Sequence, residues 1–423
     1  MVAQTMNNIS DIINLIPKML TGNELKKAMT YFPEYNNNIR KENEAIRLMS
    51  LSDLYKIYVP SNMSLEIYSK LYLALLRSLQ KKTTLDAVIQ QNENHKAILQ
   101  QEYNGILGGS DSFTIIGPSG IGKSSAINKS VKLITENKII ELDEPYTKII
   151  PCIIVQCPFD ASVKGLLLEI LRKVDEYIDS TYYKNAVKAR ATIDMLIGSV
   201  SQVALNHIGL IVVDEIQNVV NNKHGKNLIS MLTQLINNSG VSICMVGTPE
   251  CIPFFEQDMK LARRSLGLKY EKLEYNQYFY DLCNILFKFQ YIKNNTEIQD
   301  YIVEWLYEHS SGIISVVVSL IHDAQEISIL NGNETIDIKS LNEAYKNRLS
   351  MLHDFIYPSI KTNSQTTKNK RKKENKLNNN NNKCNETNKT IAIQELASIS
   401  KTNNIDIIQL LKENNISVTE VKI

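Results

Sequence analysis

The chain has 423 residues, of which 43% are hydrophobic and 22% charged, so it is long enough for two or three domains with sizeable cores. It contains no run of about 18 apolar residues, so no membrane-spanning helix is expected. The net charge of +2 is unevenly distributed, because residues 361–384 carry seven Lys and one Arg against one Glu. That segment has a net charge of +7, which leaves −5 for the rest of the chain.

The N-terminus and the cysteines indicate a cytoplasmic protein. The first twenty residues lack a basic start, and Asp11 and Lys18 interrupt their apolar positions, so they do not predict a signal peptide. The six cysteines form no CxxC pair, and we expect reduced thiols. The six histidines show no metal-ligand spacing.

The first part of the chain is predicted to be helical. Residues 63–80, MSLEIYSKLYLALLRSLQ, repeat apolar side chains at helical spacing, and Pro60 and Ser61 precede them as a plausible helix start. From Phe113 onward, short apolar runs alternate with longer helical stretches. This alternation predicts a mainly parallel sheet in an α/β domain. The expected strands are 113–116, 152–157, 210–213, 242–247 and a more polar fifth one at 269–275.

Helical patterns continue to about residue 357 and are followed by the basic, Asn-rich stretch. We expect this stretch to be disordered, since a cationic polar segment cannot bury a core. It is either a solubilising tether or a salt-sensitive contact with nucleic acid. The predicted organisation is a helical region (1–100), an α/β core (101–278), a helical lid subdomain (279–358), a disordered linker (359–390) and a short helical tail (391–423).

A phosphate-binding loop follows the first predicted strand. FTIIGPSGIGKSS contains the pattern GxxxxGKS between a predicted strand and a predicted helix, which is the context that the motif requires. Glycines let backbone N–H groups surround phosphates, and the helix N-terminus adds positive partial charge. Lys123 is expected to reach the β- and γ-phosphates, and Ser124 to bind Mg²⁺. The expected nucleotide-binding residues are Gly117, Pro118, Ser119, Gly120, Ile121, Gly122, Lys123, Ser124, Ser125 and Asp214.

Two further strand ends carry polar side chains. In GLIVVDEIQ, Asp214 is expected to hold the Mg²⁺ shell and Glu215 to polarise the attacking water as a general base. Without the phosphate loop, these residues would be an ordinary acidic strand end. In SICMVGTPE, Thr248 is expected to hydrogen-bond the γ-phosphate or the water, although Gly-Thr-Pro is also common turn chemistry.

The order of these motifs resembles an AAA+ ATPase, and a narrower resemblance is to the TnsC/TniB family of ATP-dependent regulators of DNA transposition. It covers roughly residues 40–350, with its most specific part in the Cys-Pro-x-Asp-x-Ser-x-Lys-Gly segment that begins at Cys157. The resemblance implies an α/β fold with an AAA+ P-loop core, a parallel five-stranded sheet, a helical N-terminal region, a small helical lid and a disordered basic C-terminal tail. The lid has Ser315 and valines where many AAA+ proteins carry a sensor arginine.

The arginine pair in LARRSLG has no acidic neighbour. By the AAA+ resemblance, either Arg263 or Arg264 completes the ATP site of a neighbouring subunit and stabilises charge on the γ-phosphate. The other one caps a helix, forms an ion pair or contacts DNA.

The same resemblance implies ATP and Mg²⁺ as cofactors and a homo-oligomer, either ring or filament, on double-stranded DNA. It also implies a target-selector protein and a transposase as partners, and a location at the nucleoid. We expect sequence-tolerant DNA binding, with Lys129, Lys132, Lys164, Lys184 and Lys188 as candidate contacts. The tail is either a partner-docking peptide or a weakly folded end. The alternatives for function are a replication initiator or helicase loader of the AAA+ class and a small-molecule P-loop kinase.

Overall fold

A computed structural model describes residues 16–82, 84–105, 107, 112–143, 146–220, 222–256 and 267–350. By its internal contacts the chain divides into the units Met1–Lys361 and Thr362–Ile423, and all described residues belong to the first. The arginine pair at 263–264, the basic linker and the tail at 391–423 lie outside the described residues. Among the described residues, no helix is both long and apolar enough to cross a membrane.

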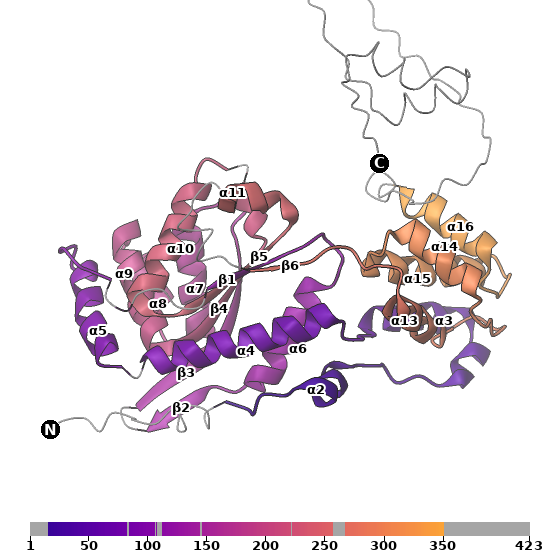
Figure 1. The fold of residues 1–423 in the computed structure, drawn as a ribbon, viewed down its shortest axis with the longest axis horizontal. Helices are drawn as coiled ribbons and strands as arrows, with labels where there is room; N and C mark the ends of the chain where they lie inside the picture. Colours follow the sequence, from indigo (N-terminus) through magenta and orange to yellow (C-terminus); the bar gives the residue numbers. More distant parts are fainter. Residues whose placement is uncertain are drawn as a thin grey trace, which may run out of the picture. The chain divides into compact units, whose positions relative to one another are not determined.

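The described sheet has the strand order β2-β3-β4-β5-β1-β6 (Figure 1). Its five neighbouring strands from β3 to β6 run parallel, and β2 pairs antiparallel with β3 at one edge. The strands are β1 (Phe113–Ile116), β2 (Ile140–Asp143), β3 (Tyr146–Gln156), β4 (Ile208–Asp214), β5 (Ser242–Gly247) and β6 (Leu268–Lys269).

Four predicted strands are confirmed, with β3 starting earlier than expected. The fifth prediction, 269–275, was wrong in extent, because β6 contains only two residues and the chain then leaves the sheet. The polar edge strand β2 was not predicted. Its sequence, IELD, does alternate apolar and acidic side chains, but the run is only four residues long and the alternation was overlooked.

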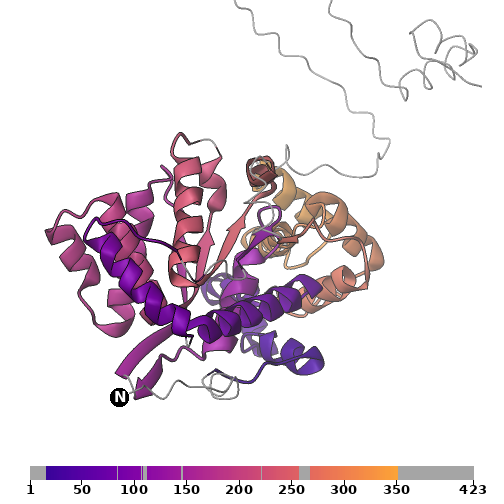
Figure 2. The same cartoon turned by 60° about the vertical axis from the view of Figure 1, so that its left-hand side comes forward.

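Helices cover both faces of the sheet, as Figures 1 and 2 show together. One core cluster combines Ile211 and Val213 of β4 with helices α7 (Val163–Ile178), α9 (Ile193–His207) and α10 (Gly225–Ser239). The other combines Leu210 and Val212 of the same strand with α2 (Gly22–Met29), α4 (Asn62–Lys82) and α6 (Lys123–Thr135). Successive side chains of β4 therefore enter opposite cores, which explains its continuous apolar sequence. The remaining elements of this part are α5 (Leu85–Ile98), α8 (Tyr182–Lys188), α11 (Ile252–Glu256), η3 (Ile216–Val219) and η4 (Pro249–Cys251).

The helices that follow β6 form a separate core. They are α13 (Gln277–Phe287), α14 (Asp300–Ser310), α15 (Ile314–Leu330) and α16 (Ile338–Asn347), and we call them the lid. Residues of the N-terminal region join this core, because Leu51 and Leu54 are buried among the lid side chains. They belong to a segment that contains η1 (Asn37–Lys41), α3 (Glu44–Ser50) and η2 (Leu51–Lys56).

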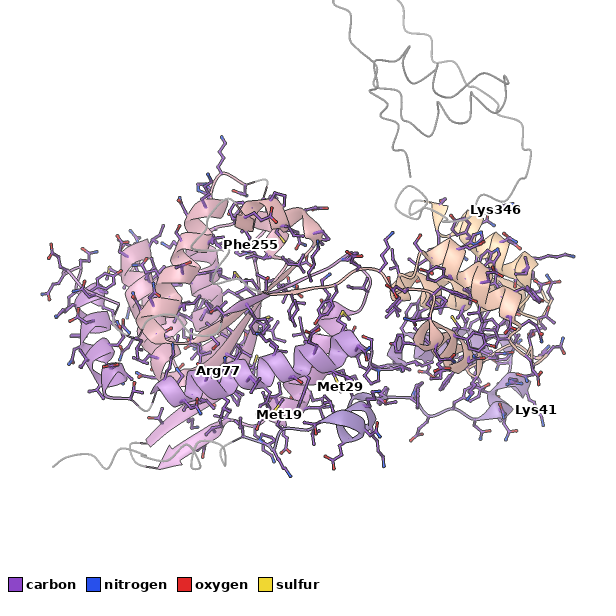
Figure 3. All side chains as sticks on the ribbon, in the orientation of Figure 1. Met19, Met29, Lys41, Arg77, Phe255 and Lys346 are labelled. Atoms are coloured by element: carbon purple, nitrogen blue, oxygen red, sulfur yellow. The ribbon has the colours of Figure 1, made fainter. Side chains whose placement is uncertain are left out.

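The N-terminal region therefore packs against two different cores. Met29 of α2, labelled in Figure 3, is fully buried in the cluster that covers the sheet. Between α2 and α4, the segment 37–56 packs on the lid. The two connections that lead to and from this segment pair with each other, since Tyr31 and Tyr58 exchange backbone hydrogen bonds of 2.9 Å in both directions.

Candidate nucleotide-binding site

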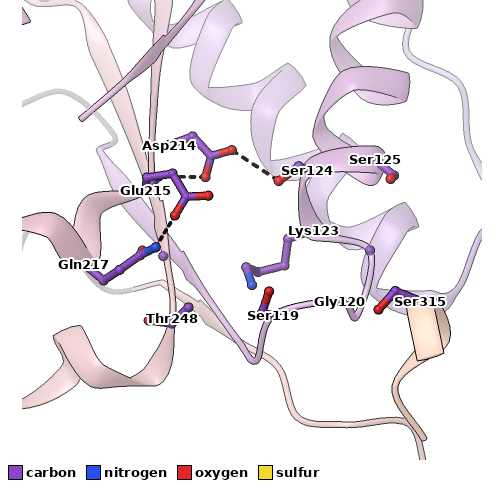
Figure 4. Close-up of a pocket in the computed structure, with 12 residues that line it drawn as sticks. Ser119, Gly120, Lys123, Ser124, Ser125, Asp214, Glu215, Gln217, Thr248 and Ser315 are labelled. Atoms are coloured by element: carbon purple, nitrogen blue, oxygen red, sulfur yellow. Dashed lines mark hydrogen bonds between the residues drawn. The ribbon is translucent and has the colours of Figure 1, made fainter. Parts of the chain in front are cut away.

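Three of the predicted motifs meet at one edge of the sheet because their strands are neighbours. Strand β5 lies between β4 and β1, so Thr248 after β5 falls between Glu215 after β4 and the loop after β1. The carboxyl ends of parallel strands are where open α/β sheets bind ligands. A cavity of about 240 Å³ opens there (Figure 4). Its lining consists of Ser119, Gly120, Gly122, Lys123, Ser124, Ser125, Asp214, Glu215, Gln217, Gly247, Thr248 and Ser315.

Glycines shape the loop that joins β1 to α6. Gly120 and Gly122 have φ angles of +81° and +97°, in the region that only glycine adopts without strain, and α6 begins at the next residue, Lys123. A Cβ atom on Gly120 would lie 2.2 Å from the Ser315 hydroxyl oxygen. The loop thus points the N-terminus of α6 into the cavity, as an anion site requires.

The ammonium group of Lys123 lies inside this loop. Its Nζ donates hydrogen bonds to the carbonyl oxygens of Gly117 (2.6 Å) and Pro118 (2.8 Å). Burial lowers the pKa of Lys123, and the nearby carboxylates of Asp214 and Glu215 oppose that shift. The positive charge is therefore held at the phosphate loop by carbonyls that an anionic ligand can replace. Gly117 and Pro118 contribute through these carbonyls, and Ile121 is buried beneath the loop.

Two oxygen groups form a fitting pair for a divalent cation. The hydroxyl of Ser124 donates to Oδ2 of Asp214 at 3.2 Å, and Oδ1 of Asp214 accepts the backbone N–H of Glu215 at 2.8 Å. Mg²⁺ prefers oxygen ligands and is commonly held by one or two protein groups together with phosphates and waters. The side chains present therefore fit the metal that the sequence predicted.

Glu215 and Thr248 face the cavity from adjacent strands. The carboxylate of Glu215 accepts a hydrogen bond from Nε2 of Gln217 (Figure 4). The hydroxyl oxygen of Thr248 is buried, and within the described part of the chain it has no hydrogen-bond partner. A buried polar group without a partner costs about 1–3 kcal/mol, so a ligand that supplies the partner is favoured. Thr248 lines the cavity, and its contact with a phosphate oxygen or a water stays a prediction. The role of Arg263 or Arg264 at a neighbouring ATP site stays a prediction, since both arginines lie outside the described residues.

The lid closes one side of the cavity through its backbone. The N–H of Ser315 donates to the carbonyl oxygen of Gly120 at 3.0 Å. Sequence reasoning noted only that Ser315 stands where an arginine is common. The structure adds that this residue contacts the phosphate loop directly.

A second cavity of about 220 Å³ was missed by sequence reasoning. It adjoins the first, since both share Gly120, Gly122, Ser125 and Ser315. Its walls come from the N-terminal region, from the phosphate loop and from the lid: Tyr55, Ile57, Tyr58, Val59, Ser61, Met63, Ser64, Ile121, Tyr278, Leu282, Leu286, Ile314, Val318 and Ser319. These mostly apolar residues have the same spacing as core residues, so no sequence signal separates them from the core.

A hydrogen bond ties two walls of this second cavity together. The hydroxyl of Tyr278 donates to the carbonyl oxygen of Val59 at 2.9 Å. Burial raises the pKa of Tyr278, so the hydroxyl keeps its proton and remains a donor. The cavity is therefore a preformed apolar slot beside the phosphate loop.

Comparison with known proteins agrees with the family resemblance. Residues 108–274 match the family model described as bacterial TniB protein. This region is similar to the TniB family, as the sequence predicted. The expected fold class, an α/β P-loop core with a mainly parallel sheet, is thereby confirmed. No curated protein sequence matches the chain.

Similar solved structures share little sequence with this chain. The ORC1 protein of Aeropyrum pernix in complex with DNA is 14% identical, with a TM-score of 0.41 over 64% of this chain and 65% of that one. Drosophila ORC bound to DNA is 10% identical, with a TM-score of 0.43 over 97% and 86%. Domain III of the Thermotoga maritima replication initiation protein DnaA is 13% identical, with a TM-score of 0.34 over 65% and 94%. At these scores the structures add nothing to the assignment.

Proposed function

We propose that the protein is an ATP-driven regulator of DNA transposition, which assembles on double-stranded DNA with ATP bound and disassembles after hydrolysis. The observation that carries this proposal is the convergence of Lys123, Glu215 and Thr248 on one cavity within a region that matches the TniB family. A transposase and a target-selector protein are the proposed partners. The TniB match favours this function over a replication initiator or helicase loader, which would use the same ATP-site residues.

The proposed reaction is hydrolysis of the γ-phosphate by water. Lys123 leaves the two carbonyls it contacts and binds the phosphates, while the N–H groups at the start of α6 hold their oxygens. Glu215 accepts the proton of the attacking water, and Thr248 orients the phosphate or that water through its hydroxyl. Ser124 and Asp214 would hold Mg²⁺, which would supply positive charge to offset the negative charge developing on the phosphates.

The second cavity is the proposed site for the base of the nucleotide. It lies next to the phosphate loop, and its walls are apolar side chains that can sandwich a flat ring. Since the walls come from the lid, the loop and the N-terminal region, a bound base would hold all three together. Nucleotide binding is thereby linked to the position of the lid.

Assembly requires groups from a neighbouring subunit, and the arginine pair is the proposed source. Either Arg263 or Arg264 would reach the neighbour's γ-phosphate. The linker at 359–390 and the tail at 391–423 are proposed as a tether and as a segment that docks on a partner.

Substitutions at the site test the proposal. Lys123→Ala should weaken ATP binding and abolish ATP-dependent assembly on DNA, measured by nucleotide fluorescence and by sedimentation. Glu215→Gln should bind ATP and DNA normally, hydrolyse slowly and leave long-lived complexes. Lys26→Ala, a substitution of an exposed lysine on α2, is the matched control for charge. Normal hydrolysis by Glu215→Gln would show that the general base is assigned wrongly.

The trans role of the arginines needs a mixing experiment. Arg263→Ala and Arg264→Ala are each mixed with Glu215→Gln, which is expected to assemble but not to hydrolyse, so that an intact ATP site from one variant meets an intact arginine from the other. Recovery of hydrolysis in only one of the two mixtures identifies the arginine that acts on the neighbour. No recovery in either mixture contradicts an arginine acting in trans.

A further inference from the structure

Gln217 lies two residues after Glu215 and touches its carboxylate. We propose that Gln217 is a positioning residue for hydrolysis, which holds Glu215 toward the cavity and accepts one proton of the attacking water in a hydrogen bond. The proposal rests on the ATPase function proposed above. It assigns a role to an amide that the sequence analysis did not single out.

Glu215 needs such a restraint because its surroundings fix its backbone but not its side chain. Its φ angle is +58°, in the left-handed region, and its N–H is fixed by the Asp214 carboxylate at 2.8 Å. The side chain beyond this point extends into an open cavity. A glutamate side chain has about 1.5–2 kcal/mol of rotamer entropy to lose when it is ordered. Nε2 of Gln217 donates to Oε2 of Glu215, which selects one of the rotamers.

Gln217 is itself anchored by its neighbours. It belongs to the short turn η3 (Ile216–Val219), in which Ile216 and Val219 are fully buried. Asn218 in the same turn donates to the carbonyl oxygen of Cys157 at 2.9 Å. On its other side Gln217 lies against Gly247, where an added Cβ would stand 3.1 Å from Oε1. The turn therefore presents the amide from a fixed base.

The orientation of the amide follows from the carboxylate beside it. With Nε2 toward Glu215, a donor meets an acceptor, whereas the reversed amide would place two acceptors in contact. This leaves Oε1 of Gln217 buried, and among the described residues no group donates to it. The hydroxyl oxygen of Thr248, which lines the same cavity, is also buried and has no hydrogen-bond partner among the described residues. Two buried polar atoms without partners at one site indicate that a polar ligand is received between them.

A water molecule at this place would form hydrogen bonds with these groups and would be oriented for attack on the γ-phosphate. One of its protons is donated to Glu215 and the other to Oε1 of Gln217, which directs an oxygen lone pair toward the γ-phosphorus. The water oxygen forms a bond to that phosphorus, and the bond from phosphorus to the β–γ bridging oxygen breaks, with its electron pair left on ADP. Glu215 takes the proton and returns it to the released phosphate. A glutamine that orients the attacking water is an established device in other P-loop enzymes.

Two variants test whether Gln217 acts through its Nε2 donor or only through the space that its side chain fills. Gln217→Ala removes the amide, and Gln217→Glu keeps its shape while replacing the donor by an acceptor. Both should lower kcat by about 10–100-fold, less than the loss of the general base itself because Glu215 remains, and leave KM and the Kd for a fluorescent ATP analogue within about twofold. Asn222→Ala, an amide in the following loop that does not line the cavity, is the matched control.

Binding of phosphate analogues gives a readout that does not depend on turnover. ADP with beryllium fluoride imitates the bound γ-phosphate, and ADP with aluminium fluoride imitates the transition state with its attacking water. The Gln217 variants should bind the beryllium complex as the unchanged protein does and the aluminium complex about tenfold or more weakly. Equal losses for both complexes would contradict the proposal and indicate a structural role.

The outcomes separate this proposal from the one on which it rests. If Glu215→Gln abolishes hydrolysis while Gln217→Ala and Gln217→Glu hydrolyse at the normal rate or faster, the ATPase assignment stands and the role of Gln217 is refuted. If Glu215→Gln hydrolyses normally, the general base itself is wrong. Slow hydrolysis by Gln217→Glu with a selective loss of aluminium fluoride binding supports the role of the donor.

Discussion

Replacement of Arg47 by Met tests the contact that holds the N-terminal region to the lid. Arg47 is 2% exposed, and its guanidinium donates two hydrogen bonds to Glu334 at 2.6 and 2.7 Å and one to the carbonyl oxygen of Tyr291 at 3.1 Å. Methionine preserves most of the volume and removes the charge. Breaking a buried ion pair by removing one partner costs about 3–5 kcal/mol. Since Glu334 keeps the backbone N–H of Lys293 at 3.0 Å, the lower end, about 3 kcal/mol, is expected.

The pH dependence of this loss has a definite sign. Burial by itself raises the pKa of Glu334, but the hydrogen bonds from Arg47 and from the Lys293 N–H outweigh burial and lower it below its ordinary value. A carboxyl group with a lowered pKa contributes stability above the pKa of the unfolded chain and loses it as the pH falls through the folded value. The difference between the unchanged protein and Arg47→Met should therefore be full at pH 7 and shrink below about pH 4.

Urea unfolding followed by circular dichroism measures both effects. Lys56→Ala, which removes an exposed ion pair with Asp53 on the same segment, is the control and should change the midpoint little. A loss of under about 1 kcal/mol for Arg47→Met at pH 7 would refute the reasoning that this pair anchors the segment. A loss that is as large well below about pH 4 as at pH 7 would refute the assignment to the Glu334 charge.

Three further substitutions test the site itself. Thr248→Val should leave the unfolding midpoint unchanged or raise it, because the buried hydroxyl has no partner within the described part of the chain, while kcat falls about tenfold; urea unfolding and steady-state ATPase assays measure the two effects. Gly120→Ala should reduce ATP affinity at least about tenfold in a fluorescence titration, because its Cβ would lie 2.2 Å from the Ser315 hydroxyl and the φ of +81° is strained for alanine. Tyr278→Phe leaves the half-buried Val59 carbonyl without its donor, so it should destabilise the protein by about 0.5–1.5 kcal/mol and weaken nucleotide binding; calorimetry checks both.

The meeting of the candidate site residues at one edge of the sheet was predictable from sequence, because each of them lies next to a strand with an unambiguous pattern. Strands β1, β4 and β5 are buried on both faces, so their apolar runs indicate where each strand ends. Gly117, Asp214 and Thr248 are thereby placed at the carboxyl ends of these strands. Parallel strands end at the same edge of a sheet, which brings these residues together. The side chains of the phosphate loop then follow from one motif.

The partners of the N-terminal region were not predictable. Leu51 and Leu54 indicate a buried face, but the pattern does not say whether that face packs on the sheet or on the lid, which lies more than 200 residues further along the chain. The apolar second cavity has the same limitation, because a residue such as Leu282 looks identical in a core and in a slot for a ligand. Gln217 was missed because its role depends on a single contact across a turn.

The path of the chain links both cavities to the position of the lid. The chain passes between the sheet and the lid three times, at 30–36, 57–61 and 270–276, and the first two passes are joined by the pairing of Tyr31 with Tyr58. The second pass lines the apolar cavity, and the lid residue Ser315 bonds the phosphate loop. A lid held at three points has less freedom than one held by a single hinge, so its movement must displace the wall of the proposed base site. A nucleotide that fits both cavities therefore favours one lid position by its difference in binding free energy, and hydrolysis removes part of that preference.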